Sequence, residues 1–313
     1  MKRAEPAQRI ALFVLVAAVL GISISGPLVR LSHSAPLAIA VWRIGISIVI
    51  IHGILLFNGQ WKQWRSLSSG DLIAAVAAGG FLALHFWSWI SSVGMTSVAA
   101  SVVLVNISPI IVVVGSSLWL DEQPTRAQTI GIGIALIGAL LLGYGDARGA
   151  ATVAGSRALA GDGLAIVGAV TVSAYLLIGR RVRQKLDLWP YVGLVYTVCF
   201  VCVLAIALVR GVPLLPVGAS APREFALFAA MALGPMMLGH TGFNWALRYY
   251  PAYIVSLAAL CEPVGATILA AMIPGIGEMP GPLTLLGGAV VMVGAIRVLS
   301  GSRSAECETS GSV

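Results

Sequence analysis

The sequence predicts an all-α integral membrane protein with ten transmembrane helices, arranged as two inverted five-helix repeats around a central cavity. Of its 313 residues, 58% are hydrophobic and only 10% are charged, whereas soluble domains carry about 25% charged residues. The 49 residues between Asp71 and Asp121 contain no Asp, Glu, Lys or Arg. That stretch accommodates two spanning helices of about 20 residues each, joined by a turn. The second half of the chain repeats a pattern of the first.

Apolar runs bounded by charged or turn residues define the ten expected helices. They cover residues 10–29, 36–57, 72–91, 97–119, 127–145, 161–179, 189–209, 224–244, 251–273 and 282–300. The first run is similar to a signal peptide. Because nine apolar segments follow it and no small-x-small cleavage site ends it, we expect it to be retained as the first helix.

The expected organisation has five parts. These are a cytoplasmic N-terminus (1–9), a first repeat (10–145), a linker (146–160), a second repeat (161–300) and a disordered cytoplasmic tail (301–313). With the N-terminus inside, 13 Lys and Arg residues lie on the inner side and five on the outer side, with Arg43 left within a helix. The positive-inside rule therefore places both termini in the cytoplasm of a bacterial inner membrane. The net charge of +7 follows from these loops, and no basic face for nucleic acid is visible.

Two sets of residues recur with the same spacing of 2, 7 and 7: Glu122, Pro124, Gly131 and Gly138 in the first half, and Glu278, Pro280, Gly287 and Gly294 in the second. Pro109 and Pro263 precede the two glutamates by 13 and 15 residues, and His85 and His240 lie 155 residues apart. Each half holds an odd number of helices, so the halves must be inverted. Inverted repeats around a midplane site are a transporter architecture.

These paired motifs resemble the EamA-type branch of the drug/metabolite transporter superfamily, over about residues 10–300. The resemblance implies ten helices, both termini inside, and a cavity lined mainly by helices 1, 3, 4, 6, 8 and 9. The aromatic and histidine residues of the third helix are also similar to those of bacterial amino acid exporters of the YddG type. The segment 274–277 departs from the family, which usually continues a helix there, and leaves the end of the ninth helix open.

Polar and aromatic side chains within the expected helices are candidates for binding substrate: His85, Trp87, Trp89, Asn106, Tyr175, His240, Asn244, Trp245 and Tyr253. The tryptophans have an alternative role as interfacial anchors, and the histidines as hydrogen-bonded structural residues. His85 is favoured for the cavity, because the aromatic residues around it would form an apolar pocket with one polar handle. The repeated glycines favour close helix packing, with a dimer contact as the alternative.

Arg43 and Glu262 are the charged residues deepest within expected helices. A buried carboxylate must be paired, protonated or near water. Two interpretations stay open: a structural Arg43–Glu262 ion pair, or a Glu262 that titrates and couples transport to protons. Pro109 and Pro263 are expected to kink their helices and to permit gating.

The sequence favours a secondary transporter that exports neutral or aromatic amino acids by alternating access. Proton-coupled efflux of drugs or other metabolites is the alternative, and a membrane enzyme or channel is an alternative of another class. No P-loop is present, no catalytic or metal cluster is evident, and no cofactor is expected. The expected partners are a small-molecule substrate and the lipid bilayer, for a monomer or weak homodimer. A single buried cation disfavours phosphorylated substrates.

Overall fold

The computed structural model describes residues 4–93, 95–96, 101, 104–149, 156–273 and 279–310, and these residues form helices and connecting turns only. The helices of the first half are α1 (Ala4–Ser23), α2 (Ser25–Leu31), α3 (Pro36–Asn58), the 3₁₀ helix η1 (Gln60–Ser66), α4 (Ser69–Val93), α6 (Ser108–Trp119) and α7 (Arg126–Gly149). Those of the second half are α8 (Ser156–Arg183), α9 (Leu188–Val209), α10 (Ala221–Met231), the π-helix η2 (Ala232–His240), α11 (Thr241–Ala246), α12 (Ala252–Ala259), α13 (Glu262–Met272) and α14 (Pro282–Ser310).

Within the described residues, nine helical segments are long and apolar enough to cross a membrane, and each coincides with an expected helix. The tenth expected helix, 97–119, contributes the short apolar helix α6, while several residues before α6 lie outside the described part of the chain. The predicted all-helical membrane fold is therefore confirmed. One difference is at the C-terminus, where α14 continues to Ser310 although we expected a disordered tail from Gly301. Residues 274–278, where the sequence left the end of the ninth helix open, lie outside the residues that the structure describes.

The largest helix contacts of the described residues are matched when the two halves of the chain are exchanged. The second helices of the repeats, α3 and α9, pack against each other, and so do the fifth helices, α7 and α14. Helix α4 packs on α8, and its counterpart, the helix made of α10, η2 and α11, packs on α1. In the same way α6 packs on α8, and its counterpart α13 packs on α1. The two repeats are thus related by a pseudo-two-fold axis.

The repeated glycines form the contact between α7 and α14. A Cβ atom at Gly131 would lie 3.0 Å from the carbonyl oxygen of Gly294, and one at Gly294 would lie 2.6 Å from that of Gly131. Gly138 and Gly287 meet in the same reciprocal way, at 2.8 and 2.7 Å. Later residues of α7 meet earlier residues of α14, so the equivalent helices are antiparallel and the repeats are inverted. The predicted packing role is confirmed, within one chain.

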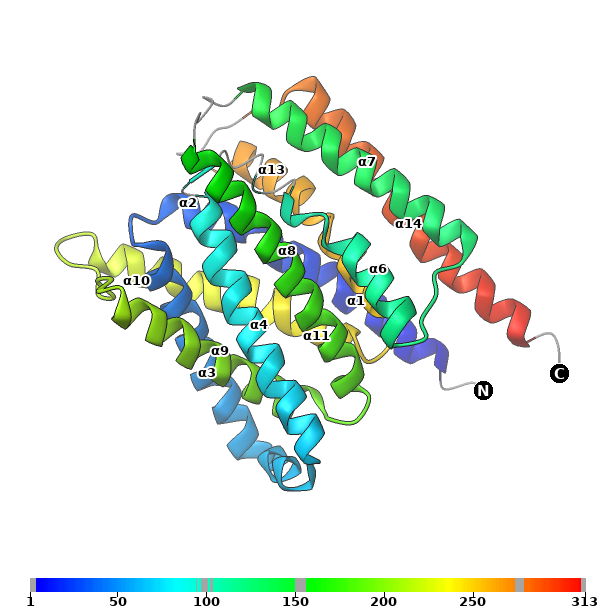
Figure 1. Ribbon diagram of the computed structural model, residues 1–313, viewed down its shortest axis with the longest axis horizontal. Coiled ribbons are helices and arrows are strands. Elements are labelled where there is room, and N and C mark those ends of the chain that lie inside the picture. Colours follow the sequence, from blue (N-terminus) through cyan, green and yellow to red (C-terminus); the bar gives the residue numbers. More distant parts are fainter. Residues whose placement is uncertain are drawn as a thin grey trace.

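Both ends of the described chain lie on one side of the bundle, where α1 begins and α14 ends (Figure 1). We refer to this side as the N-terminal face.

If the N-terminal face lies in the cytoplasm, reporter fusions at Gly301 and within residues 146–160 should lie on opposite sides of the membrane. A fluorescent protein that matures only in the cytoplasm should be bright at Gly301 and dark in the linker, and alkaline phosphatase should give the reverse. The same side for both fusions would contradict the orientation.

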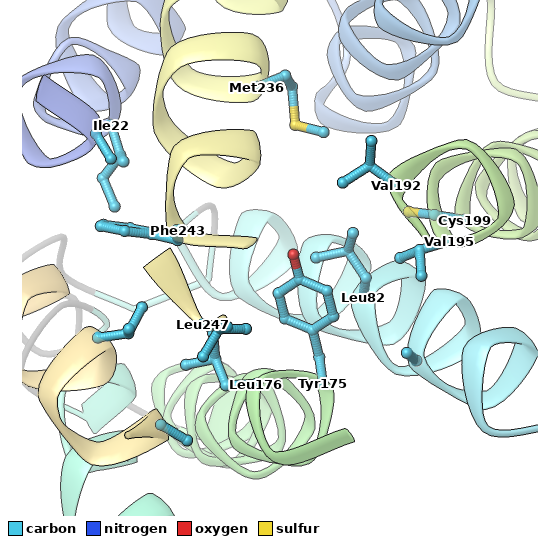
Figure 2. Packing of buried hydrophobic residues seen from close by; sticks show 14 of the residues in the cluster. Ile22, Leu82, Tyr175, Leu176, Val192, Val195, Cys199, Met236, Phe243 and Leu247 are labelled. Carbon is cyan, nitrogen blue, oxygen red and sulfur yellow. The ribbon is translucent and has the colours of Figure 1, made fainter. Parts of the chain in front are cut away.

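The buried core joins the two repeats. Figure 2 shows Leu82 of α4, Tyr175 of α8, Val195 and Cys199 of α9, and Met236 of η2 packed together. The Tyr175 hydroxyl points into the middle of these apolar side chains (Figure 2). A polar group in such a place needs a hydrogen-bond partner, and that partner belongs to the site described next.

Candidate functional site

Three transmembrane helices are interrupted inside the bundle. The first breaks at Ile24, between α1 and α2, and the ninth breaks at Leu260 and Cys261, between α12 and α13. The fourth has the equivalent turn at Asn106 and Ile107, before α6 begins. A broken helix exposes backbone polar groups, which are tolerated at membrane depth only within protein or beside a water-filled space. The breaks therefore indicate the level at which a polar site is built.

The two predicted kink residues follow two of these breaks. Pro109 is the second residue of α6, and Pro263 is the second residue of α13. Proline suits the first turn of a helix, because its missing N–H would have no intrahelical acceptor there. Ile107 and Cys261, which come just before these starts, keep right-handed helical dihedral angles, so each interruption is a local irregularity within one transmembrane helix. Gating at these prolines stays a prediction. The eighth helix is irregular as well, because η2 is a π-helix that contains Pro235, and π-helical turns are frequent at functional sites.

Arg43 and Glu262 both contact the serines that flank the break between α1 and α2. The Arg43 Nη1 lies 3.5 Å from the Ser25 hydroxyl, and the Ser23 hydroxyl lies 3.3 Å from the backbone carbonyl oxygen of Glu262. Arg43 is 1% exposed, whereas Glu262 is only half-buried. Among the described residues, no ion pair within 4.0 Å joins the two side chains. The direct pair that the sequence suggested is thus not formed within this distance.

An aromatic wall stands beside Arg43. The guanidinium carbon lies 4.8 Å from the centre of the Phe86 ring, and the His240 ring meets Phe86 edge-on at 5.3 Å. His85 is buried, and its Nδ1 donates a hydrogen bond to the Gly168 carbonyl oxygen of α8 at 3.0 Å. His85 is therefore anchored to the protein by one nitrogen. His240 is half-buried and is therefore the more exposed of the two histidines.

A hydrogen-bonded layer lies between this wall and the N-terminal face. The side-chain amide of Asn244 donates to the Tyr175 hydroxyl and, at 2.8 Å, to the His240 carbonyl oxygen. The Tyr196 and Thr241 hydroxyls are 3.1 Å apart, and Thr241 donates to the Met236 carbonyl oxygen of the π-helix at 3.0 Å. The layer stabilises the irregular backbone of η2 by satisfying its carbonyl groups.

An ion pair joins three helix ends at the N-terminal face. The Arg180 Nε lies 2.6 Å from a Glu122 carboxylate oxygen, and both side chains are less than one-fifth exposed. Arg180 also donates to the Leu247 carbonyl oxygen at 2.7 Å, and the Ala252 amide donates to the second Glu122 oxygen at 3.3 Å. We call this arrangement the Arg180–Glu122 clamp. It links α8, the segment after α6, and the turn between α11 and α12, beside a surface pocket of about 400 Å³.

Comparison with known proteins assigns the chain to a family. The model of the EamA-like transporter family matches residues 9–144 and 159–300, that is, most of the chain in two copies. The chain belongs to the EamA-like transporter family.

Individual relatives of this EamA-like transporter are distant. It is 24% identical over 281 residues to the uncharacterized transporter YyaM of Bacillus subtilis, covering 85% of this chain and 87% of that protein. Over 82 residues it is 36% identical to the probable 4-amino-4-deoxy-L-arabinose-phosphoundecaprenol flippase subunit ArnE of Aeromonas hydrophila, covering 26% of this chain and 69% of that protein. A solved crystal structure superposes with a TM-score of 0.76 at 18% identity, covering 94% of this chain and 98% of the other, and supports the fold alone.

Inverted symmetry of the transporter also appears at its loops. At the start of α4, Asp71 accepts hydrogen bonds from Lys185, in the connection after α8. At the start of α10, Glu224 accepts hydrogen bonds from the Ser32 hydroxyl, the Ser34 hydroxyl and the His33 amide, in the connection after α2. In both cases an acidic residue in the first turns of the third helix of one repeat accepts hydrogen bonds from the loop of the other repeat. That loop connects the first and second helices. The two latches lie at opposite faces of the bundle.

The other candidates of the sequence lie away from Arg43 and Glu262. The Trp87 ring is half-buried and lies 5.4 Å from the guanidinium carbon of Arg210, at the end of α9. Trp89 stacks on His85 at 6.4 Å. Trp245 contacts the Tyr249 ring at 4.5 Å, and the Tyr253 hydroxyl donates to Gln128 of α7 at 3.1 Å, both nearer the N-terminal face. Asn106 lies half-buried in the turn before α6.

Sequence reasoning missed several residues of the site. Ser23 and Ser25 gave a signal, because they are hydroxyl side chains in an otherwise apolar helix, but nothing related them to Arg43 or Glu262. Phe86 was noted only as a neighbour of His85. Arg180 was counted for orientation and Glu122 for the repeat, and their contact depends on how the helix ends meet.

Proposed function

We propose that this EamA-like transporter is a secondary transporter that exports small zwitterionic metabolites, above all amino acids with apolar or aromatic side chains, by alternating access. In this proposal it lies in a bacterial inner membrane with the N-terminal face toward the cytoplasm, and it catalyses no covalent reaction. The observation that carries the substrate class is the fully buried Arg43, which has no ion-pair partner within 4.0 Å among the described residues and lies against Phe86. One cation beside an aromatic wall suits a single carboxylate attached to an apolar group.

Phosphorylated substrates are disfavoured by the same charges. A phosphate group carries up to two negative charges and is usually held by several Arg or Lys side chains or by helix N-termini. Near the helix breaks, Arg43 is joined by the acid Glu262 and by two histidines, His85 and His240. The name of the ArnE protein indicates a lipid-linked sugar phosphate, but the similarity to it covers only 26% of this chain. That substrate is therefore not carried over.

Alternating access is supported by the symmetry of the bundle. Inverted repeats allow two equivalent arrangements that open to opposite sides. At the N-terminal face the Arg180–Glu122 clamp joins three helix ends, and the hydrogen-bonded layer of Tyr175, Tyr196 and Asn244 lies above it. In this conformation the N-terminal face is the closed side.

Exchange of labelled substrate in liposomes tests the proposal. Purified protein in liposomes loaded with phenylalanine is expected to accumulate external labelled phenylalanine by counterflow, and protein-free liposomes are not. Serine and phosphoserine differ by one phosphate group, and only serine is expected to compete. Loss of preloaded label, with and without an imposed proton gradient, then separates facilitated from proton-coupled export. Competition by phosphoserine and none by any neutral amino acid would contradict the proposal.

A further inference from the structure

We propose that Arg43 and Glu262 bind the two charged ends of one zwitterionic substrate, with its carboxylate on Arg43 and its ammonium on Glu262. This inference rests on the proposed function and adds to it the orientation of the substrate. It is carried by the geometry of the two side chains, of the helix break between α1 and α2, and of the aromatic wall beside it.

Arg43 has hydrogen-bonding capacity that the protein does not use. A guanidinium has five N–H donors in a planar fork. In the described part of the chain, the side chain makes one long hydrogen bond, 3.5 Å from Nη1 to the Ser25 hydroxyl, and its buried Nε has no partner. A buried cation is stable only with an opposite charge or full hydrogen bonding. The planar fork fits a carboxylate, which accepts two parallel hydrogen bonds.

Glu262 offers the complementary charge. It is the first residue of α13, where the positive end of the helix dipole favours a carboxylate over a neutral acid. The described residues provide no hydrogen bond or ion pair to its side-chain oxygens, since only its backbone carbonyl is contacted, by Ser23. The residue is half-buried, so the described part of the protein does not enclose it completely. An ammonium group satisfies it with both charge and hydrogen bonds.

The two residues contact one short segment. Ser25 contacts the guanidinium of Arg43, Ser23 contacts the backbone carbonyl of Glu262, and only Ile24 separates the two serines. The Ser23 side chain also touches Gly265, where an added Cβ would collide with the serine hydroxyl. Arg43 and Glu262 thus both adjoin the α1–α2 break, and among the described residues no ion pair within 4.0 Å joins them. An α-amino acid carries its carboxylate and its ammonium on one Cα, so a single molecule bound at this segment offers an anionic group to Arg43 and a cationic group to Glu262.

The aromatic wall beside Arg43 determines where the side chain of the bound amino acid lies. Phe86 lies against the guanidinium, and His240 lies edge-on to Phe86 on the side toward the hydrogen-bonded layer. With the carboxylate on Arg43, the side chain of the amino acid lies along these two rings. Aromatic and large apolar side chains gain most from such a surface, since aromatic pairs add to the stabilisation from burial.

Competition by three ligands of one shape tests the assignment. Phenylalanine carries both charges, phenethylamine lacks the carboxylate, and 3-phenylpropionate lacks the ammonium. Each charge-assisted contact contributes a factor of about 10 to 100 in affinity. The wild-type protein in liposomes is therefore expected to bind phenylalanine at least tenfold more tightly than either analogue. This comparison needs no variant, so it holds even where a substitution prevents folding.

Variants that remove one charge show which residue binds the carboxylate of the substrate and which binds its ammonium. Glu262→Gln is expected to weaken phenylalanine about tenfold or more and to leave 3-phenylpropionate unchanged. Arg43→Gln is expected to weaken phenylalanine and 3-phenylpropionate but not phenethylamine, and Arg43→Lys should restore part of the loss. Arg223→Gln, which removes an exposed arginine at the start of α10, is the control and should alter none of the three affinities.

Three results would overturn the inference. Phenylalanine transport without discrimination between the three ligands would leave the proposed function standing and remove the split site. Equal loss of all three ligands in both variants would show a structural role for Arg43 and Glu262. If Glu262→Gln abolished only the response to a proton gradient and left ligand preference intact, Glu262 would be the coupling group. Failure of the proposed function has a separate sign, which is that the wild-type protein exchanges no amino acid.

Discussion

Replacing Gly138 with leucine is expected to prevent α7 and α14 from packing and to lower the stability of the folded protein. A Cβ at this position would lie 2.8 Å from the Gly287 carbonyl oxygen and would also collide with the Val291 amide. These are backbone atoms of the neighbouring helix, so rotation of a side chain cannot relieve the collision. Overpacking of an interior costs about 1–3 kcal/mol, and more where the backbone must move. The measurement is the apparent melting temperature and the monodisperse yield in detergent.

Gly133→Leu is the matched control. It lies on the same helix and makes the same change in volume, but an added Cβ at Gly133 would meet no atom within 4 Å. Replacing a helical glycine there should be neutral or stabilising, by up to about 1 kcal/mol from helix propensity. Equal destabilisation by the two variants would show that α7 and α14 are not held together by close approach at the glycines.

The transmembrane segments could be predicted because the bilayer imposes a simple rule on composition. About 20 apolar residues are needed for each crossing, and the ten apolar runs satisfied it. The repeat was also visible, since Gly131 and Gly287 occupy equivalent positions in a common spacing of 7 residues. The breaks were only partly predictable. Pro109 and Pro263 marked two of them, but Ile24 carries no signal of its own. The carbonyl groups of the π-helix η2 accept hydrogen bonds from Thr241 and, in α3, from Ser47, and no local pattern predicts these contacts.

The candidate site could be predicted in its parts but not in its assembly. Arg43 and Glu262 were found because charge within a membrane is costly and therefore rare. Their separation depends on how the second, ninth and first helices meet, which no local pattern encodes. Trp87 was grouped with His85 because the two residues are close in sequence. Nearby residues of a helix point in different directions, and the Trp87 ring lies against Arg210 instead.

Removing the negative charge of Glu122, in the variant Glu122→Gln, is expected to open the N-terminal face. The Arg180–Glu122 clamp is largely buried, and breaking one partner leaves the other charge without compensation. A loss of about 1.4 kcal/mol from the closed state alone raises the population of the open state tenfold. Ser256, which is 1% exposed on α12, is a suitable reporter once changed to cysteine in a chain whose four native cysteines are replaced. Labelling of that cysteine by a water-soluble maleimide should accelerate about tenfold in Glu122→Gln.

Arg248→Gln is the control for this prediction, because it breaks a second ion pair at the same face. Arg248 and Asp187 are 2.8 Å apart, but their side chains are 41% and 45% exposed, and exposed pairs contribute about 0–1 kcal/mol. Hydrogen bonding from Gln63, followed by that from Arg248, holds the pKa of Asp187 below its usual value, so the control pair is ionised at neutral pH. Its removal should leave the labelling rate unchanged. If Arg248→Gln accelerated labelling as much as Glu122→Gln, general loosening of the face would explain both. An unchanged rate in Glu122→Gln would mean that the hydrogen-bonded layer above the clamp, rather than the ion pair, keeps the N-terminal face closed.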